Sequence, residues 1–192
     1  RLNIKYSKTP RKLPTVLTKD EIKSLLSKIQ NKKHLLMISL MYSAGLRVSE
    51  LVNLRLKDFE FKNNFGYVRQ GKGSKDRVFI LSTKLKGEII KYSEDNKLGN
   101  EDYIVKGYKN KHYSQRSVQE IVKRAAKKAK INKHVHCHTL RHSFATHLVE
   151  DGYDIATIQS LLGHSSSETT MIYIHMASPR LINVKSPLDS FD

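Results

Sequence analysis

The sequence predicts a mainly α-helical domain with a small three-stranded antiparallel β-sheet. Apolar residues recur at helical spacing in several segments, and capping residues and glycines mark where those segments begin and end. Between residues 59 and 81 the pattern changes to short β-prone runs separated by turn-like sequences. A chain of 192 residues is long enough for one such domain with a sizeable core, or for one domain plus an extension.

The chain opens with a basic stretch, residues 1–17, which we interpret as an arm or an inter-domain linker. Its first 14 residues hold five Lys or Arg, two prolines and no acid. Thr18 and Glu21 then form a capping box that starts a helix and the main domain, predicted over residues 18–178. A second helix, about 33–43, is apolar nearly all round and should be central.

Gly45 should end that second helix, and a third is predicted from about Arg47 to Leu54. Three predicted strands follow, at 59–61, 67–70 and 77–81. The intervening sequences KNNFG and GKGSKD are turn-like, which favours antiparallel pairing. A further helix is expected near 83–95, before an irregular segment at 98–113.

Ser117 and Glu120 form a second capping-box pattern, predicted to open a helix that runs to about Lys130. One face of this helix is apolar. The opposite face is basic and is a candidate DNA-binding surface, with Lys123, Arg124, Lys127 and Lys128 as its contacts.

Three short helices are predicted to close the domain. Thr139 is expected to cap the first, which Gly152 ends, and Asp154 to cap the second, which Gly163 ends. The third covers about 167–176. The tail, residues 179–192, is a possible segment for docking on a neighbouring protomer, using Leu181, Ile182, Val184, Leu188 and Phe191.

The formal net charge is +17, from 35 Lys and Arg against 18 Asp and Glu. A charge of this size on a small domain favours a polyanionic partner, nucleic acid before a membrane surface. The longest apolar run, LLMISLMY at 35–42, is too short to span a bilayer, and no signal peptide is visible. The single cysteine, Cys137, is typical of a reducing compartment, so we expect a cytoplasmic protein without a membrane partner.

The stretch HTLRHSFATHL (138–148) invites a zinc hypothesis, since His138 and His142 have the spacing of a helical ligand pair. However, Thr139 stands where a zinc protease has its Glu, and Arg141 would bring a positive charge beside a dication. No C-x-x-C pair is present. We therefore expect no metal, assign His142 to hydrogen-bonded support, and expect no chemical role for His134, His136 and His147.

A phosphate fits the same stretch better. Arg141, in the first turn of its helix, can bind two phosphate oxygens at once near free backbone N–H groups. His138 lies just ahead and could exchange a proton. Arg47 has a similar position at a helix start, and a pair with Glu50 could orient it.

Three further residues could complete a reaction centre. Lys72, in the turn GKGSKDR, could donate a proton to a leaving oxygen. Tyr173, on the last predicted helix, is a candidate nucleophile. His164 directly follows the end of the helix before it. A phenol has a pKa near 10, so it needs a proton acceptor and nearby positive charge. The two arginines, the two histidines and the lysine would supply both if they converge.

These residues resemble those of the tyrosine recombinase (phage integrase) family, especially its Xer-type members. The matching motifs, in family order and at family intervals, are AGLRVSEL (44–51), GKGSKDR (71–77), HTLRHSFATHL (138–148), LLGHSS (161–166) and TTMIYIH (169–175). The resemblance implies the catalytic-domain fold of DNA breaking–rejoining enzymes. It also implies that a separate N-terminal core-binding domain is absent from this chain.

The resemblance implies a role for each matched residue. Arg47, Arg141 and His164 would activate the scissile phosphate and Tyr173 would attack it, giving a 3′-phosphotyrosyl link. Lys72 would protonate the 5′-oxygen, and His138 would assist proton transfer. Neither ATP nor a metal would be required. Lys75, three residues after Lys72, is a further candidate DNA contact.

The implied partner is double-stranded DNA at a specific site, bound by a tetramer in the synaptic complex, while the fragment alone could be a monomer or dimer. Three alternatives remain open: a type IB topoisomerase, a non-catalytic DNA-binding module of the same fold, and a metallohydrolase. Every expected catalytic position is filled, which disfavours the non-catalytic module.

Overall fold

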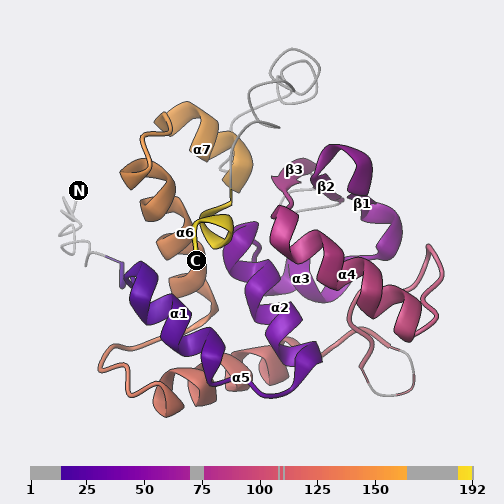
Figure 1. Ribbon diagram of the computed structural model, residues 1–192, viewed down its shortest axis with the longest axis horizontal. Helices are drawn as coiled ribbons and strands as arrows, with labels where there is room; N and C mark the ends of the chain where they lie inside the picture. The colour runs from indigo at the N-terminus through magenta and orange to yellow at the C-terminus, as the bar shows by residue number, and fades with distance from the viewer. Residues whose placement is uncertain (1–13, 70–75, 108, 110, 164–185, 192) are drawn as a thin grey trace, which may run out of the picture.

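The structure, a computed structural model, describes residues 14–69, 76–107, 109, 111–163 and 186–191 (Figure 1). It confirms a mainly α-helical fold with a three-stranded antiparallel sheet. The helices are α1 (Lys19–Ser27), α2 (Lys32–Ser43), α3 (Val48–Asn53), α4 (Thr83–Asp95), α5 (Gln115–Lys128), α6 (Cys137–Glu150) and α7 (Ile155–Leu162). The strands are β1 (Phe59–Glu60), β2 (Phe65–Val68) and β3 (Arg77–Ile80), and short 3-10 turns are η1 (Leu56–Asp58), η2 (Phe61–Asn63) and η4 (Pro187–Ser190).

Helix α2 lies at the centre of the domain, as its apolar sequence predicted. Every residue from Leu36 to Ser43 is buried, and α2 contacts α1, α3, α4 and α6. Helix α5 lies below α1 and α2 in Figure 1. Among the described residues, no helix combines the length and apolar character needed to cross a bilayer.

The sheet has the order β1-β2-β3, with both pairs antiparallel. β1 is shorter than predicted because Phe61 already begins the turn η2, and β2 starts earlier, at Phe65. The turn is completed by Asn64, whose φ of +55° is left-handed, so the predicted five-residue turn closes sooner and Gly66 joins the strand.

Most predicted helix ends are confirmed. The Thr18–Glu21 capping box is present, and Asp154 accepts a hydrogen bond from the Thr157 N–H at 2.8 Å. The three glycines predicted to end helices, Gly45, Gly152 and Gly163, all have positive φ. Local rules of helix termination therefore held at these positions.

Two predicted caps are wrong. Helix α5 begins at Gln115, with Ser114 as its N-cap, so Ser117 lies inside the first turn. Helix α6 begins at Cys137 after His136, whose Nδ1 accepts from the Thr139 N–H. Thr139 instead accepts from the His136 N–H, which makes the cap reciprocal. In both cases an earlier residue takes the extended cap conformation.

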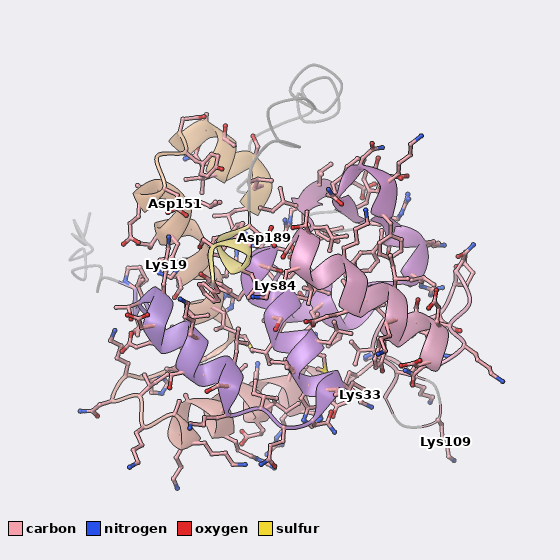
Figure 2. All side chains as sticks on the ribbon, viewed as in Figure 1. Lys19, Lys33, Lys84, Lys109, Asp151 and Asp189 are labelled. Carbon is pink, nitrogen blue, oxygen red and sulfur yellow. The ribbon has the colours of Figure 1, made fainter. Side chains whose placement is uncertain are left out.

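The C-terminal segment 186–191 packs against this chain's own helices (Figure 2). Ser186 donates to the Ser43 carbonyl, and Phe191 stacks on Tyr42 with ring centroids 5.6 Å apart. Asp189 accepts a backbone N–H from Lys84 at 3.2 Å and thereby helps to cap α4. Docking of the tail on a neighbouring protomer stays a prediction.

Candidate active site

The carboxylate of Glu50 lies among the arginine side chains of the described part of the site. It accepts the Arg47 backbone N–H and the Arg47 Nη1, each at 2.7 Å, so the predicted ion pair is present. Arg47 is the N-cap residue of α3, and Glu50 occupies the third helical position. Glu50 is buried, whereas the Arg47 side chain retains some exposure. This geometry orients the Arg47 guanidinium, as the sequence suggested.

Arg77, the first residue of β3, is a second partner of Glu50 that sequence reasoning missed. Its Nη2 donates to Glu50 Oε2 at 2.6 Å, and its Nη1 donates to the Leu161 carbonyl. Only 3% of Arg77 is exposed. The arginine therefore joins β3, α3 and the end of α7. The available signal was a charged residue inside a predicted strand that is otherwise apolar, because a buried charge requires a partner.

Arg141 is buried one full turn into α6, beside the same carboxylate; the predicted first-turn position is wrong because the helix already begins at Cys137. Its Nη1 donates to the Gly45 carbonyl at 2.6 Å and lies 3.7 Å from Glu50 Oε2, while Nη2 donates to the Leu162 carbonyl. A guanidinium has five N–H groups, so these two hydrogen bonds do not use all of its donors. They hold the planar group between the α2–α3 turn and the end of α7.

Three guanidinium groups thus face one carboxylate, and the pKa values reflect this imbalance. Burial alone would raise the pKa of Glu50, but the charge and hydrogen bonds of Arg77 and Arg47 bring it down to about 2. Burial, together with the charges of Arg77 and Arg47, lowers the pKa of Arg141 to about 9. The cluster therefore has more positive than negative charge in a largely buried place.

His138 lies one helical turn before Arg141–His142 and is exposed. His142 is also exposed and makes no hydrogen bond with any described residue, so the structure does not show the predicted hydrogen-bonded support. Its ring centroid is 6.5 Å from that of His138. The described part of the chain gathers no group of three His, Cys, Asp or Glu side chains suited to a metal ion. His147, deeper in α6, bonds the Tyr42 hydroxyl at 2.8 Å.

Four predicted site residues, Lys72, Lys75, His164 and Tyr173, lie outside the described residues. Two of the segments that carry them adjoin the arginine cluster in sequence. Arg77 closely follows the segment with Lys72, and His164 directly follows Gly163. Their roles stay predictions.

The predicted DNA-binding face of α5 is present as an exposed basic surface. Val118, Val122, Ala125 and Ala126 are buried on the other side of the helix. The exposed residues are Lys123, Arg124, Lys127 and Lys128. Only Lys123 forms a salt bridge among these four in the described structure, with Glu120 at 3.2 Å. The remaining charges face solvent, where a polyanion could reach them.

Gly163 is fitted closely to Arg77, which leads to a stability prediction. Its φ is +59°, and an added Cβ would lie 2.6 Å from Arg77 Cδ. Gly152 has a φ of +87° but open space around that position. Gly152→Ala should therefore cost about 1 kcal/mol of unfolding free energy, from backbone strain alone. Gly163→Ala should lower the free energy of unfolding by clearly more. Urea denaturation of both variants measures this, and equal losses would contradict the close fit of Gly163 to Arg77.

Comparison with known proteins identifies the family. The model of the phage integrase family matches residues 15–180, most of the chain. The chain belongs to the phage integrase family. A relative within it, the tyrosine recombinase XerA of Pyrococcus horikoshii, is 43% identical over 180 residues, which cover 93% of this chain and 62% of the relative. The chain thus spans less than two thirds of that protein's length.

Solved structures of integrase-family proteins share the fold. The crystal structure of XerA recombinase aligns with a TM-score of 0.73 and 32% identity, over 91% of this chain and 63% of that one. XerH site-specific recombinase, solved with its palindromic difH substrate in a post-cleavage complex, aligns with a TM-score of 0.71 and 28% identity, over 88% and 52%. The Xer-type resemblance predicted from the motifs is confirmed.

Proposed function

We propose that this chain is the catalytic part of a site-specific DNA recombinase that cleaves and rejoins strands through Tyr173. The arginine cluster carries the proposal: three positive charges, from Arg47, Arg77 and Arg141, face the single negative charge of Glu50. A phosphodiester under attack gains negative charge on its non-bridging oxygens, which such a cluster would stabilise. Membership of the phage integrase family supports the same reaction.

In the proposed reaction the Tyr173 oxygen attacks the scissile phosphorus while the bond to the 5′-oxygen breaks. The tyrosine proton passes to His138, and Lys72 donates a proton to the leaving 5′-oxygen. Arg47, Arg141 and His164 hold the phosphate. The 5′-hydroxyl of another strand then attacks the phosphotyrosine and restores the phosphodiester. The phosphotyrosyl bond conserves the energy of the original bond, so the step uses no ATP and no metal.

The proposed partner is double-stranded DNA, which agrees with the net charge of +17. XerH, a solved relative, is a site-specific recombinase seen on its difH substrate. Exchange between two duplexes requires four cleavages, so we propose a tetramer in the synaptic complex. We further propose action in the cytoplasm, which the single cysteine of the chain favours.

A covalent-adduct assay tests the proposal. The chain is incubated with a nicked duplex, selected for binding from a random-sequence pool, in the presence of EDTA. We expect a protein–DNA adduct that resists denaturation, and its proteolytic fragment should carry Tyr173. The Tyr173→Phe variant should bind the duplex and form no adduct.

Four outcomes would contradict the proposal. Adduct formation by Tyr173→Phe would exclude this nucleophile, and loss of the adduct on chelation would favour a metal-dependent reaction. A shifted band without any adduct would indicate a DNA-binding module. Relaxation of supercoiled plasmid without strand exchange would instead favour the topoisomerase alternative.

The basic face of α5 gives a separate prediction. Replacing Lys123, Lys127 and Lys128 with alanine should weaken DNA binding. The slope of log affinity against log salt should fall by about one for each phosphate that a lysine no longer neutralises. A control with the same charge change replaces Lys28, Lys62 and Lys91, which are exposed residues elsewhere on the domain. If both triple variants change the slope equally, the α5 face has no special role.

A further inference from the structure

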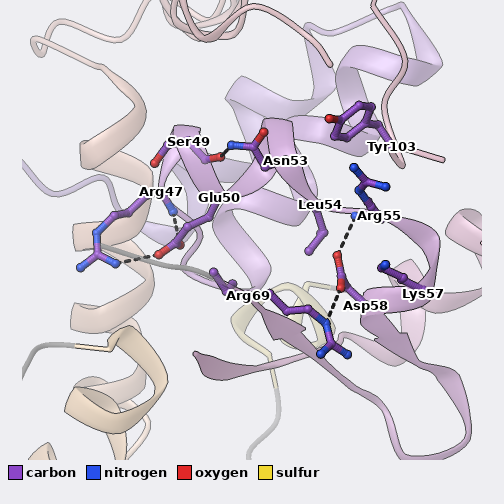
Figure 3. Close-up of a pocket in the computed structure, with 11 residues that line it drawn as sticks. Arg47, Ser49, Glu50, Asn53, Leu54, Arg55, Lys57, Asp58, Arg69 and Tyr103 are labelled. Atoms are coloured by element: carbon purple, nitrogen blue, oxygen red, sulfur yellow. Dashed lines mark hydrogen bonds and ion pairs between the residues drawn. The ribbon is translucent and has the colours of Figure 1, made fainter. Parts of the chain in front are cut away.

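A charged cleft opens beside Arg47 (Figure 3), and Arg141 is not among the residues that line it. Its volume is about 650 Å³, and α3, the turn η1, the end of β2 and Tyr103 line it. Four cations face it: Arg47, Arg55, Lys57 and Arg69. Such a volume is larger than one phosphate group needs, so the cleft can take a longer anionic chain.

The acids of the cleft are already engaged by arginines. Glu50 holds Arg47 and Arg77, and the buried carboxylate of Asp58 accepts from Arg69 Nε at 3.0 Å and from the Arg55 N–H at 2.9 Å. Four positive charges therefore face two negative charges in the lining. This balance favours an anion over a cation, and the few aliphatic side chains offer little to an apolar ligand.

Two of the arginines are held in place before any ligand binds. The Arg69 guanidinium lies over Tyr67, 5.5 Å from the ring centroid, and its Nε is fixed on Asp58. Its side chain is 55% exposed, and no described residue accepts from its terminal nitrogens. Those nitrogens present a planar fork suited to phosphate oxygens. Within the described part of the chain, Arg69 is thus oriented by Asp58 and Tyr67, and its terminal nitrogens are left without an acceptor.

On the opposite wall, Arg55 lies over Tyr103 at 5.0 Å. Arg55 and Lys57 both pair with Glu101, an exposed acid at the rim. Including Glu101, the cleft still has one positive charge in excess. Because Glu101 is exposed, its pairs are weak and a phosphate can compete for these two cations.

The position of the cleft indicates which anion it takes. Arg47 belongs both to the arginine cluster and to the cleft lining. A DNA strand whose scissile phosphate lies on the cluster is covalently continuous, so its next phosphates must run along one side of Arg47. The cleft is a cationic path that starts at this residue.

We propose that the cleft binds the sugar–phosphate backbone of the cleaved strand beside the scissile phosphate, with Arg69 as its main contact. The proposal rests on the function proposed above and assigns the path of the substrate. Because the contact is to phosphate rather than to a base edge, it is independent of sequence. It aligns the scissile phosphate with the arginine cluster, so its loss affects both binding and cleavage.

Phosphate-by-phosphate substitution in the DNA tests this path. In the Tyr173→Phe background, which permits binding at equilibrium, each phosphate near the nick is replaced in turn by a neutral methylphosphonate. With Arg69 present, the protein should bind the duplex more weakly when the neutral group replaces one or two phosphates next to the scissile phosphate. With Arg69→Gln, binding is already weaker, and the same replacements should cause no further loss, which is a non-additive result.

Further variants serve as controls. Arg69→Lys keeps the charge and should recover most of the salt slope, whereas Arg69→Gln should lower it by about one. Lys91→Gln, an equal charge change on α4, should behave as wild type at every position. Thermal unfolding of all three variants checks that they are folded.

The outcomes separate the two proposals. If wild-type protein forms no adduct, the recombinase function fails. If wild type forms the adduct, and Arg69→Gln shows the wild-type rate and the wild-type methylphosphonate pattern, only the DNA path through the cleft fails. An acidic protein segment as the true occupant would give this second result.

Discussion

Arg141→Ala is expected to slow formation of the covalent adduct by roughly 100- to 1,000-fold, the usual effect of removing one donor from a charged transition state. The guanidinium lies 3.7 Å from the Glu50 carboxylate that also holds Arg47, so both arginines can reach one phosphate. The substitution also removes hydrogen bonds to the Gly45 and Leu162 carbonyls. Single-turnover cleavage and thermal unfolding should be measured together.

A second substrate separates transition-state stabilisation from folding. If the scissile phosphate is a methylphosphonate, less negative charge develops during attack. The loss of cleavage rate caused by Arg141→Ala should then be smaller. Arg141→Lys keeps a charge but not the planar fork, so an intermediate rate is expected. A deficit of equal size on both substrates would mean that Arg141 acts only by supporting the two backbone turns.

Glu50→Gln should be the most destabilising single change in the cluster, by about 3–5 kcal/mol of unfolding free energy. It leaves Arg77 and Arg141, both buried, without their shared counter-charge. The folded-state pKa of Glu50 is about 2, below its ordinary value of 4.5. A lowered carboxyl pKa stabilises the fold fully above the ordinary value, and this stability declines as pH falls toward about 2.

Urea unfolding across this range provides the measurement. The stability difference between wild type and Glu50→Gln should be constant near neutral pH and should shrink between pH 4.5 and pH 2. Glu101→Gln is the matched control, because Glu101 also pairs with two cations but is exposed. A constant difference down to pH 2 would show that the Glu50 charge does not stabilise the fold.

The elements that sequence reasoning predicted well depend on short-range rules. Thr18, Asp154 and the helix-ending glycines act within one turn of the chain, and each was confirmed. The two wrong caps, at Ser117 and Thr139, also came from these short-range rules. Where two residues one turn apart can both cap, local rules do not decide between them, and the packing of α5 and α6 selects the earlier start.

In the site, too, contacts between residues close in sequence were predictable and contacts between distant residues were not. The pair of Arg47 with Glu50 spans three residues and was predictable. Arg77 was missed because its partners, Glu50 and Leu161, lie 27 and 84 residues away in sequence. The hydrogen bonds of Arg141 to two distant carbonyls were hidden for the same reason. Motifs located the charged residues, but only the fold shows that they share one carboxylate.

The anchoring of residues 186–191 has a consequence for the reach of the proposed nucleophile. Ser186 is attached to α2, and the Leu162 carbonyl is held by Arg141, so the stretch with Tyr173 has both ends fixed. An extended chain spans at most about 3.6 Å per residue, and Tyr173 is ten residues from Gly163. Tyr173 therefore stays within about 36 Å of that glycine. The proposed attack is therefore confined to phosphates within that radius, whichever protomer holds them.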